Sequence, residues 1–427
     1  MNLIKDLPEL TQAGVISKET ASAIQDFYEK KKNSSNNPLF IIFGILGSIL
    51  VGLGIILILA HNWDELGRVT KTIIAFVPLV TGQLTCAYVF FKKSNSNAWS
   101  ESASAFLFIA VGASISLISQ IYNIPGNLGS FLLTWSLLCL PLIYLMKSSI
   151  ASILYLIGIT CFACEANYWS SSSNESQWFW FLYLGVLPHY YHLYKNKPIS
   201  NFMTFHNWII PISLLIVLGS VAQSTEELLV PAYFSLLGLF YLIGDLEFIR
   251  NQKSRNNGYR ILSSIGTIGM LLVLSFDWYW DHLKYTNFSF KEFLLAPEFI
   301  ATAIITILAG GLLVMKFKNS SFNTFKPISF LFLAFIGIFL VGMYSNAAII
   351  LINFCVLALG ILTIRNGAQQ NHLGIMNFGL LIITALVTCR FFDTDLSFVI
   401  RGIMFLAVGT GFFSLNYWLL KKRTNHA

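Results

Sequence analysis

Fourteen apolar stretches follow one another along this chain, and each is about as long as a helix must be to cross the hydrocarbon core of a bilayer. We therefore predict an all-α fold, a polytopic bundle of about 14 transmembrane helices. Spans four and five are separated by only three residues, and Pro141 interrupts the first of them, so a single re-entrant hairpin is the alternative there. The predicted spans are 39–60, 72–91, 103–121, 131–146, 150–164, 178–194, 205–221, 229–248, 261–276, 299–315, 328–344, 347–364, 373–389 and 397–419.

The basic residues crowd into every second gap between these stretches. With a cytoplasmic N-terminus, the cytoplasmic segments hold 21 of the 27 Lys and Arg residues and 8 of the 20 acids. This gives a net charge of +13 on that side and −6 on the other. An excess of Lys and Arg in cytoplasmic loops is what orients membrane proteins, so we predict that both termini are cytoplasmic. The basic residues left on the outer side are Arg68, Lys71, Lys284, Lys291, Arg390 and Arg401.

Composition excludes a water-soluble globule, because 56% of the residues are hydrophobic and only 11% are charged, against about 25% charged in soluble domains. Membrane lipid is therefore the expected partner of most of the surface. The positive charge is spread thinly over short loops, which argues against nucleic-acid binding. All six cysteines lie within or at the ends of spans, so we expect no disulfide framework, and we interpret Cys161 and Cys164 as packing residues.

Three parts are predicted: a cytoplasmic helical hairpin with its linker at 1–38, the transmembrane domain at 39–420, and a basic cytoplasmic tail at 421–427. In the hairpin a first helix should stop at Gly14, and Ser17 should cap a second helix with one apolar face. The hairpin either packs on the membrane domain and headgroups or docks a protein partner. No apolar signal-peptide core precedes the first span. The oligomeric state is not predictable from the sequence.

Charged residues concentrate in the first and last outer loops. The first is His61-Asn-Trp-Asp-Glu-Leu-Gly-Arg68, and the last is Arg390-Phe-Phe-Asp393-Thr-Asp395, with Arg401 entering the final span. An arginine inside a span needs a carboxylate, a carbonyl or water beside it. Either these residues bind an anionic headgroup on the outer face, or they form an ion-pair clasp between the first and last helices. The candidate substrate-binding residues are Asp64, Glu65, Arg68, Gln120, Arg390, Asp393 and Arg401.

Gln120 belongs to a polar run, Ser119-Gln-Ile-Tyr-Asn-Ile-Pro-Gly-Asn127, at the outer end of the third span. Pro125 and Gly126 break the backbone there, which is tolerated at membrane depth only where protein or water satisfies it. The run is interpreted either as a cavity wall or as a simple interfacial turn before Trp135.

No pattern indicates an enzyme, a metal or a cofactor, and we name no catalytic residue. His189 and His192 share one helical face, but neither an acid nor a cysteine stands beside them. Acids are missing from the centres of all spans, which disfavours ion coupling by a central carboxylate, although an acid near an inner end could still relay protons. Asn353 and other mid-span polar residues are expected to bond neighbouring helices.

Several motifs together resemble the bacterial predicted-membrane-protein family called domain of unknown function 2157. They are Leu10-xx-Ala13-Gly14-xx-Ser17, Asn62-Trp-Asp-Glu-Leu66, Gln120-Ile-Tyr122 with Gly126, Trp135 and Leu140-Pro-Leu142. Arg390-Phe-Phe-Asp393 is similar to the closing motif of longer members. Asn127 departs from the Asp that the family carries after the glycine. The resemblance implies a multi-pass protein of the bacterial inner (cytoplasmic) membrane. It does not indicate which activity the protein has.

Three functions fit these observations. The first is a carrier or flippase-like protein for a lipidic or envelope-linked substrate with an outer-face site, since the chain has many spans and no soluble catalytic domain. The second is a membrane scaffold or sensory subunit whose N-terminal hairpin meets a partner. The third is an envelope transferase or hydrolase that uses an outer carboxylate as base and arginines to hold phosphate.

Overall fold

The computed structural model describes residues 3–34, 63–169, 177–222, 226–250, 254–285, 294–319, 326–391 and 397–424. All regular structure in these ranges is helical, which confirms the predicted fold class. The chain divides into two compact units, Met1–Phe76 and Val77–Ala427, and each is described by itself.

The first unit contains α1 (Leu3–Gln12), α2 (Lys18–Ser34), the short 3-10 helix η1 (Trp63–Glu65) and the first turns of α4 (Arg68–Lys92). Gly14 lies beyond the end of α1 with φ of +68°, a conformation that glycine adopts without strain. The Ser17 hydroxyl then accepts from the Thr20 amide at 3.1 Å and caps α2. These local signals for a helical hairpin are therefore visible in the structure, whereas its cytoplasmic location stays a prediction.

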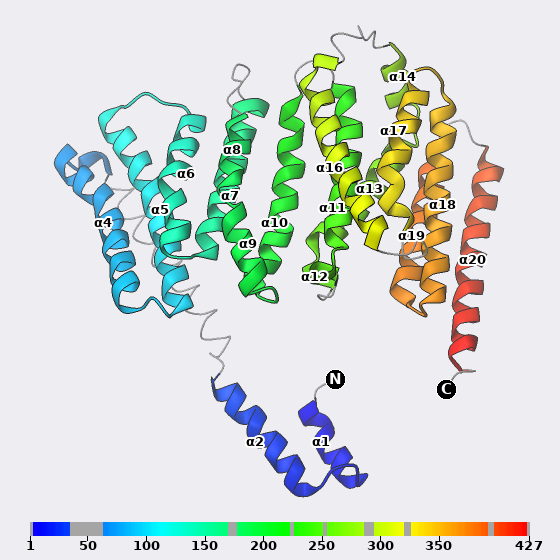
Figure 1. The fold of residues 1–427 in the computed structure, drawn as a ribbon, viewed down its shortest axis with the longest axis horizontal. Helices are drawn as coiled ribbons and strands as arrows, with labels where there is room; N and C mark the ends of the chain where they lie inside the picture. Colours follow the sequence, from blue (N-terminus) through cyan, green and yellow to red (C-terminus); the bar gives the residue numbers. More distant parts are fainter. Residues whose placement is uncertain are drawn as a thin grey trace. The chain divides into compact units, whose positions relative to one another are not determined.

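The second unit holds the remainder of α4 and all later helices (Figure 1). They are α5 (Asn97–Tyr122), α6 (Leu128–Leu145), α7 (Ser149–Cys164), α8 (Trp178–Leu184), α9 (Leu187–Asn196), α10 (Asn201–Leu218), α11 (Leu229–Gly244), α12 (Glu247–Arg250), α13 (Gly258–Val273), α14 (Trp278–Tyr285), α16 (Pro297–Asn319), α17 (Leu331–Gly342), α18 (Ala347–Gln369), α19 (Leu373–Phe391) and α20 (Phe398–Thr424).

The structure does not confirm the predicted count of about 14 spans. Nine helices of the described part are long and apolar enough to cross a membrane, and the count rises to ten if the bent pair α13 and α14 forms one span. The predicted span 39–60 lies outside the described residues. The apolar helix ending in α17, Pro327–Gly342, is shorter than the others.

The predicted span 178–194 is two short helices instead of one. Helix α8 ends at Gly185, and Pro188, in the first turn of α9, has no amide N–H to donate to the preceding turn. Two tyrosine hydroxyls donate hydrogen bonds to the backbone carbonyls at this break: Tyr144 donates to Gly185, and Tyr155 donates to Leu182 at 3.0 Å. The break is therefore compensated from α6 and α7.

Spans four and five, in contrast, are two separate helices, and each is long and apolar enough to cross a membrane by itself. Helix α6 ends at Leu145, and Lys147 turns the chain with φ of +50°. Ser148 then caps α7 by accepting from the Ala151 amide at 3.1 Å.

Successive helices of the second unit run in alternating directions. The turns after α4, α6, α9 and α18 lie at the lower side in Figure 1, and those after α5, α7 and α17 lie at the upper side. The lower turns or the helix ends beside them carry Lys93, Lys147, Lys197 and Arg365. The alternation of charge in the sequence therefore matches an alternation of helix direction.

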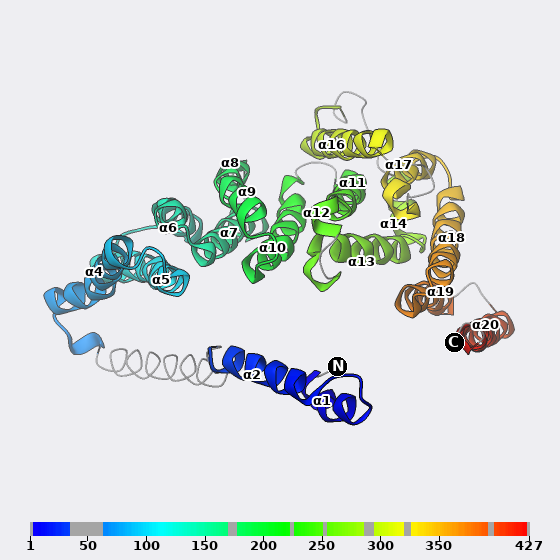
Figure 2. The ribbon, with the colours of Figure 1, turned by 60° about the horizontal axis from the view of Figure 1, so that its bottom comes forward.

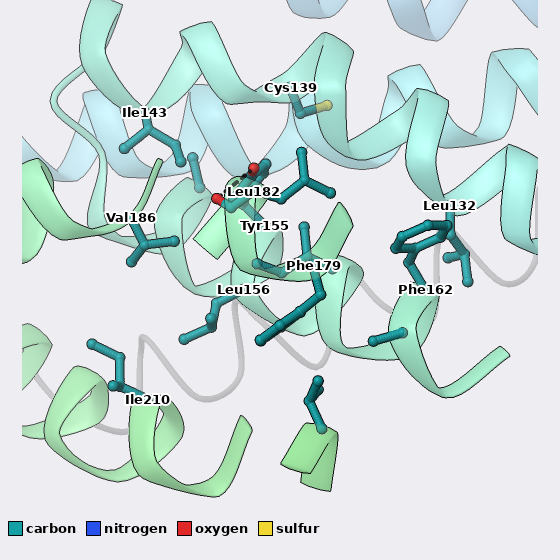
Figure 3. Close-up of a cluster of buried hydrophobic side chains, with 14 of the residues drawn as sticks. Leu132, Cys139, Ile143, Tyr155, Leu156, Phe162, Phe179, Leu182, Val186 and Ile210 are labelled. Atoms are coloured by element: carbon teal, nitrogen blue, oxygen red, sulfur yellow. Dashed lines mark hydrogen bonds between the residues drawn. The ribbon is translucent and has the colours of Figure 1, made fainter. Parts of the chain in front are cut away.

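Two large apolar clusters and a small third one stabilise the described part of this unit. The first joins α5–α11 around Tyr155, Leu156, Phe162 and Phe179, all fully buried (Figure 3). The second joins α11, α13, α14 and α17–α19, which lie side by side in Figures 1 and 2.

Helices α18 and α19 approach each other very closely. A Cβ on Gly360 would lie 2.5 Å from Ile383, and one on Gly379 would lie 2.7 Å from the Ile364 backbone nitrogen. Small residues allow such close approach where lipid supplies little driving force for helix association. This contact fixes the position of α19, which carries Arg390 in its last turn.

Candidate functional site

The second unit bends sharply at its upper side in Figure 1, where α13 and α14 meet at a bend of 73°. Buried aromatic residues fix the bend. The Trp280 indole N–H donates to the Leu274 carbonyl at 2.7 Å, and the Tyr279 hydroxyl donates to the Glu227 carbonyl at 2.9 Å. The Trp280 ring fills the space above Gly342 of α17, where an added Cβ would lie 2.2 Å from the ring. The break is therefore a built element of the fold.

Arg390 reaches this break from α19. Its guanidinium donates to the Ser275 hydroxyl at 3.2 Å and lies 4.6 Å from the centre of the Phe276 ring. A cation over an aromatic face gains electrostatic attraction, more so where water is displaced. The half-buried Arg390 side chain thus points at Ser275 and Phe276, in the turn between α13 and α14.

Ser275 is fixed on its other side by α18. The Asn353 amide donates to the Ser275 carbonyl at 3.2 Å and to the Ile349 carbonyl of its own helix at 2.8 Å. Ser275 itself is fully buried, and its hydroxyl donates to the Leu272 carbonyl at 2.6 Å. We call Ser275, Phe276, Asn353 and Arg390 the outer node. Asn353 bonds a neighbouring helix, as the sequence predicted.

Polar contacts also fix the side chains of α14. His282 Nδ1 lies 2.9 Å from a Glu227 oxygen, and Lys284 Nζ lies 2.9 Å from an Asp281 oxygen. The exposed Trp278 side chain is also on this helix. Helix α14 therefore carries charged and aromatic side chains together.

Of the predicted site residues, Arg390 alone has a described place in the outer node. Asp64, Glu65 and Arg68 belong to the first unit, where all three are exposed at η1 and the start of α4. Beside them Lys71 lies 5.5 Å from the centre of the Trp63 ring. Their predicted role as site residues stays a prediction.

Gln120 is not brought together with Arg390. It is exposed near the end of α5, which packs on α6 and α7, whereas α19 packs on α13, α18 and α20. The two helices lie far apart within the second unit in both ribbon views (Figures 1 and 2). Asp393 lies outside the described residues, and of Arg401 the structure describes the helix, α20, but not the side chain.

The polar run that follows Gln120 is a capped turn. Asn123 ends α5 in the left-handed conformation, with φ of +49°. Asn127 begins α6 by accepting from the Ser130 amide at 2.7 Å, and the Ser130 hydroxyl faces the Asn127 backbone in a capping box. Trp135 then donates to the Phe108 carbonyl at 2.8 Å and locks α6 onto α5. Of the two interpretations, these contacts favour the interfacial turn.

Sequence reasoning missed Ser275 and Phe276. Ser275 looked like any hydroxyl at the end of an apolar stretch, and the only available signal was the dense aromatic run that begins at Phe276. That run marks where the helix turns into the interface.

Residues 8–152 match the family model described as Predicted membrane protein (DUF2157). The predicted resemblance is therefore confirmed over this stretch, which ends in α7, while the resemblance of Arg390-Phe-Phe-Asp393 lies outside it and stays a prediction. No curated protein and no solved structure matches the chain. Together with its apolar helices, the match identifies a multi-pass membrane protein, and the family description states no activity.

Proposed function

We propose that this membrane protein is a carrier or flippase-like protein of the bacterial inner membrane, and that it handles an anionic lipidic or envelope-linked substrate at its outer face. The observation that carries the proposal is the placement of Arg390 at the break between α13 and α14. The inner-membrane location is supported by the charge alternation and by the family resemblance.

A broken span is the usual way for a membrane carrier to build a binding site. Helix ends and irregular backbone at membrane depth need partners, and carriers place such breaks where a substrate is bound. Here hydrogen bonds from the Trp280 and Asn353 side chains fix the backbone at the bend. The bend can therefore hold the Arg390 guanidinium in one position.

Arginine is the cation that suits this substrate class. Its planar guanidinium presents five N–H donors in a fork that matches phosphate and carboxylate oxygens. Exposed aromatic residues such as Trp278 would contact the apolar part of the anionic substrate. In this proposal Gln120, Asp393 and Arg401 belong to the outer face of the second unit, and Asp64, Glu65 and Arg68 stay predicted substrate-binding residues of the first unit.

The test is to extract the protein with its native lipid in nanodiscs and to identify what co-purifies by mass spectrometry. The wild type is expected to retain a specific anionic lipid or glycan precursor that Arg390→Ala loses. Arg365→Ala is the matched control, since Arg365 is an exposed arginine at the opposite end of the neighbouring helix α18. If all three proteins carry the same bulk lipid, the outer-face site is wrong.

A scaffold or sensory role is the second candidate, and one observation favours it. Helices α1 and α2 enclose a surface depression lined by Leu7, Thr11, Ala21 and Gln25. A small helical hairpin with such a face suits partner docking. Deleting residues 1–38 should abolish a scaffold function and leave the co-purified molecule of a carrier unchanged.

The enzyme hypothesis has its own discriminating variant. If an outer carboxylate acts as general base, Asp393→Asn should abolish turnover of a phosphate-linked substrate while leaving its binding nearly intact. A carrier should instead keep its transport rate within a few-fold in that variant.

A further inference from the structure

Helix α16 lies on the outside of α11 (Figure 2). Among the nine candidate spans of the described part it is the least buried, with 17% of its apolar stretch buried against 72% for α11. On its free face Ile304, Ile307 and Leu308 are more than half exposed. Lipid is as apolar as these side chains, so burial of apolar surface does little to keep such a helix against its neighbour. Polar contacts must therefore contribute to its position.

The upper end of α16 is anchored by apolar and polar contacts together. Ala296, just before the helix, and Phe299 pack in the second apolar cluster, which also contains Trp280. The Thr302 hydroxyl donates to the Leu228 carbonyl, just before α11, at 3.3 Å. This end of α16 is therefore joined to the same cluster that fixes the bend between α13 and α14.

A hydroxyl pair and an ion pair connect the rest of α16 to α11. The hydroxyl oxygens of Ser235 and Thr306 lie 2.7 Å apart. In the last turn of α16, Lys316 forms an ion pair with Asp245, the residue that ends α11. The two charged side chains are only 16% and 8% exposed. Contacts between charged groups are stronger than those between neutral hydroxyls, so the ion pair determines how firmly the lower end is held.

Asp245 is the fixed partner of this pair. The Asn257 side chain of the α13 cap donates to the carbonyl of the preceding residue, Gly244, at 2.7 Å. A Cβ on Gly244 would lie 2.8 Å from the Arg260 backbone nitrogen, so the start of α13 is packed tightly against this end of α11. Lys316, in contrast, extends on a flexible stem from the least buried helix. If the pair separates, α16 is the part that moves.

Both charges can reach water once they separate. Each lies at the end of its helix, and the Lys316 stem can extend further toward the headgroups. Separation therefore exchanges a desolvated ion pair for two hydrated ions. The Coulomb attraction within a buried pair and the cost of its desolvation oppose each other, so such a contact can close and reopen.

We infer that the Asp245–Lys316 pair is a latch, and that α16 is a gate helix that this latch closes at its lower end. When the pair opens, α16 turns about its anchored upper end, and its lower half leaves α11. The Phe317 ring, whose centre lies 5.5 Å from that of Phe330, then separates from it. The movement also opens the small third apolar cluster between α16, α11 and α17, which consists of Leu242, Ala309, Leu313 and Phe332.

This inference goes beyond the proposed outer-face function and does not rest on it. The latch and its opening concern α11, α13 and α16, whereas the proposed ligand is held by Arg390 of α19. For a carrier, the gate would let the apolar chain of a lipidic substrate pass at the side opposite the outer node. For a sensory protein, it would provide two distinct arrangements of one helix.

The test is double electron–electron resonance on the full-length protein in lipid nanodiscs. Spin labels are attached to non-natural amino acids, so that the six cysteines stay unchanged. One label replaces Lys318, exposed at the lower end of α16, and the other replaces Arg255, exposed in the short 3-10 helix Ser254–Asn256 before α13. In Lys316→Met the distance between the labels should lengthen by about 5 Å or more. Lys316→Arg keeps the ion pair and should give the wild-type distance.

Two further label pairs are the controls. Arg255 and Gln369, which is exposed at the end of α18, both lie outside α16, so their distance should stay the same in Lys316→Met. Leu295 and Tyr344 are exposed beside the upper ends of α16 and α17. Their distance should change by less than about 2 Å, because the gate turns about this end.

Two results would overturn the inference. An unchanged distance between Lys318 and Arg255 in Lys316→Met would show that α16 is held without the ion pair. Equal lengthening at the upper label pair would show that the whole helix detaches instead of turning about one end. If Lys316→Met fails to fold, Asp245→Asn tests the same pair from α11 and should give the same lengthening.

Discussion

Two charged side chains of the second unit have different surroundings. Arg390 is half buried and reaches from α19 to the Ser275 hydroxyl and the Phe276 ring, whereas the buried Glu101 accepts from three donors at the start of α7. An arginine at a helix end presents a planar fork that suits anionic oxygens. A carboxylate embedded in a complete set of hydrogen bonds contributes to the fold itself.

The difference teaches which polar residues of a membrane bundle to interpret as ligand-binding. Hydrogen bonds to a helix N-terminus explain Glu101 without a substrate. For Arg390, the contacts with Ser275 and Phe276 fix the direction of the side chain. Variants should therefore affect stability most at Glu101 and ligand retention most at the outer node.

Glu101→Ala should give the largest loss of stability. It removes the acceptor of two amides and one hydroxyl at the buried start of α7, and we expect a cost of about 3 kcal/mol in the free energy of unfolding. Denaturation in detergent micelles, followed by the loss of helical circular dichroism, measures this cost. Glu226→Ala, at an exposed position of the short 3-10 helix Glu226–Leu228, is the control and should change stability by less than about 0.5 kcal/mol. Equal losses of stability in the two variants would contradict the conclusion that Glu101 accepts hydrogen bonds from all three donors.

Gly342→Ala should be the next most severe change. Its new methyl group would lie 2.2 Å from the Trp280 ring, so the ring must move and its bond to the Leu274 carbonyl must lengthen. We expect a cost of about 1 to 3 kcal/mol, together with loss of the molecule retained at the outer node.

Gly337→Ala is its control on the same helix, because a Cβ there meets no atom within 4 Å. It should leave both stability and ligand retention unchanged or slightly improved. A Gly342→Ala protein that is as stable as Gly337→Ala would show that Trp280 is free to move and that the bend is not rigid.

Most of the helical architecture was predictable because the bilayer imposes a single length and polarity on every span. The separation of α6 from α7 was predicted with a re-entrant hairpin as the alternative, but the left-handed turn at Lys147 and the cap formed by Ser148, which produce it, were not. The break at Gly185 and the bend after α13 were also missed. Both are stabilised by side chains from other helices, which hydropathy does not report.

The candidate site was predictable only in part. Arg390 was marked by its charge beside an apolar span, yet its partners Ser275 and Phe276 are distant in sequence and have no distinctive pattern. A contact between two residues that each lack a distinctive sequence pattern can be found only when the positions of their helices are known.

Arg390→Lys should separate charge from geometry at the outer node. The charge remains, but the planar fork and its stacking on Phe276 are lost, so retention of an anionic molecule should fall about tenfold while stability changes by less than about 1 kcal/mol. Quantitative mass spectrometry of the co-purified molecule measures retention. Arg365→Lys should leave the retention of the molecule unchanged. If Arg390→Lys retains the molecule as well as the wild type does, only the charge of Arg390 matters and not its planar shape.

Asn127→Asp should have the smallest effect and is the sharpest test of the family motif. The resemblance implies an acid at this position, but the side chain acts here as a helix cap that accepts from the Ser130 amide at 2.7 Å. Aspartate accepts equally well and favours a helix N-terminus, so stability should change by less than about 0.5 kcal/mol, while Asn127→Ala should cost about 1 kcal/mol. Thermal denaturation of the wild type and the two variants compares them. If Asn127→Asp instead altered the retained molecule, the acid of the family motif would have a role beyond capping, and the turn after Gln120 would belong to a functional site.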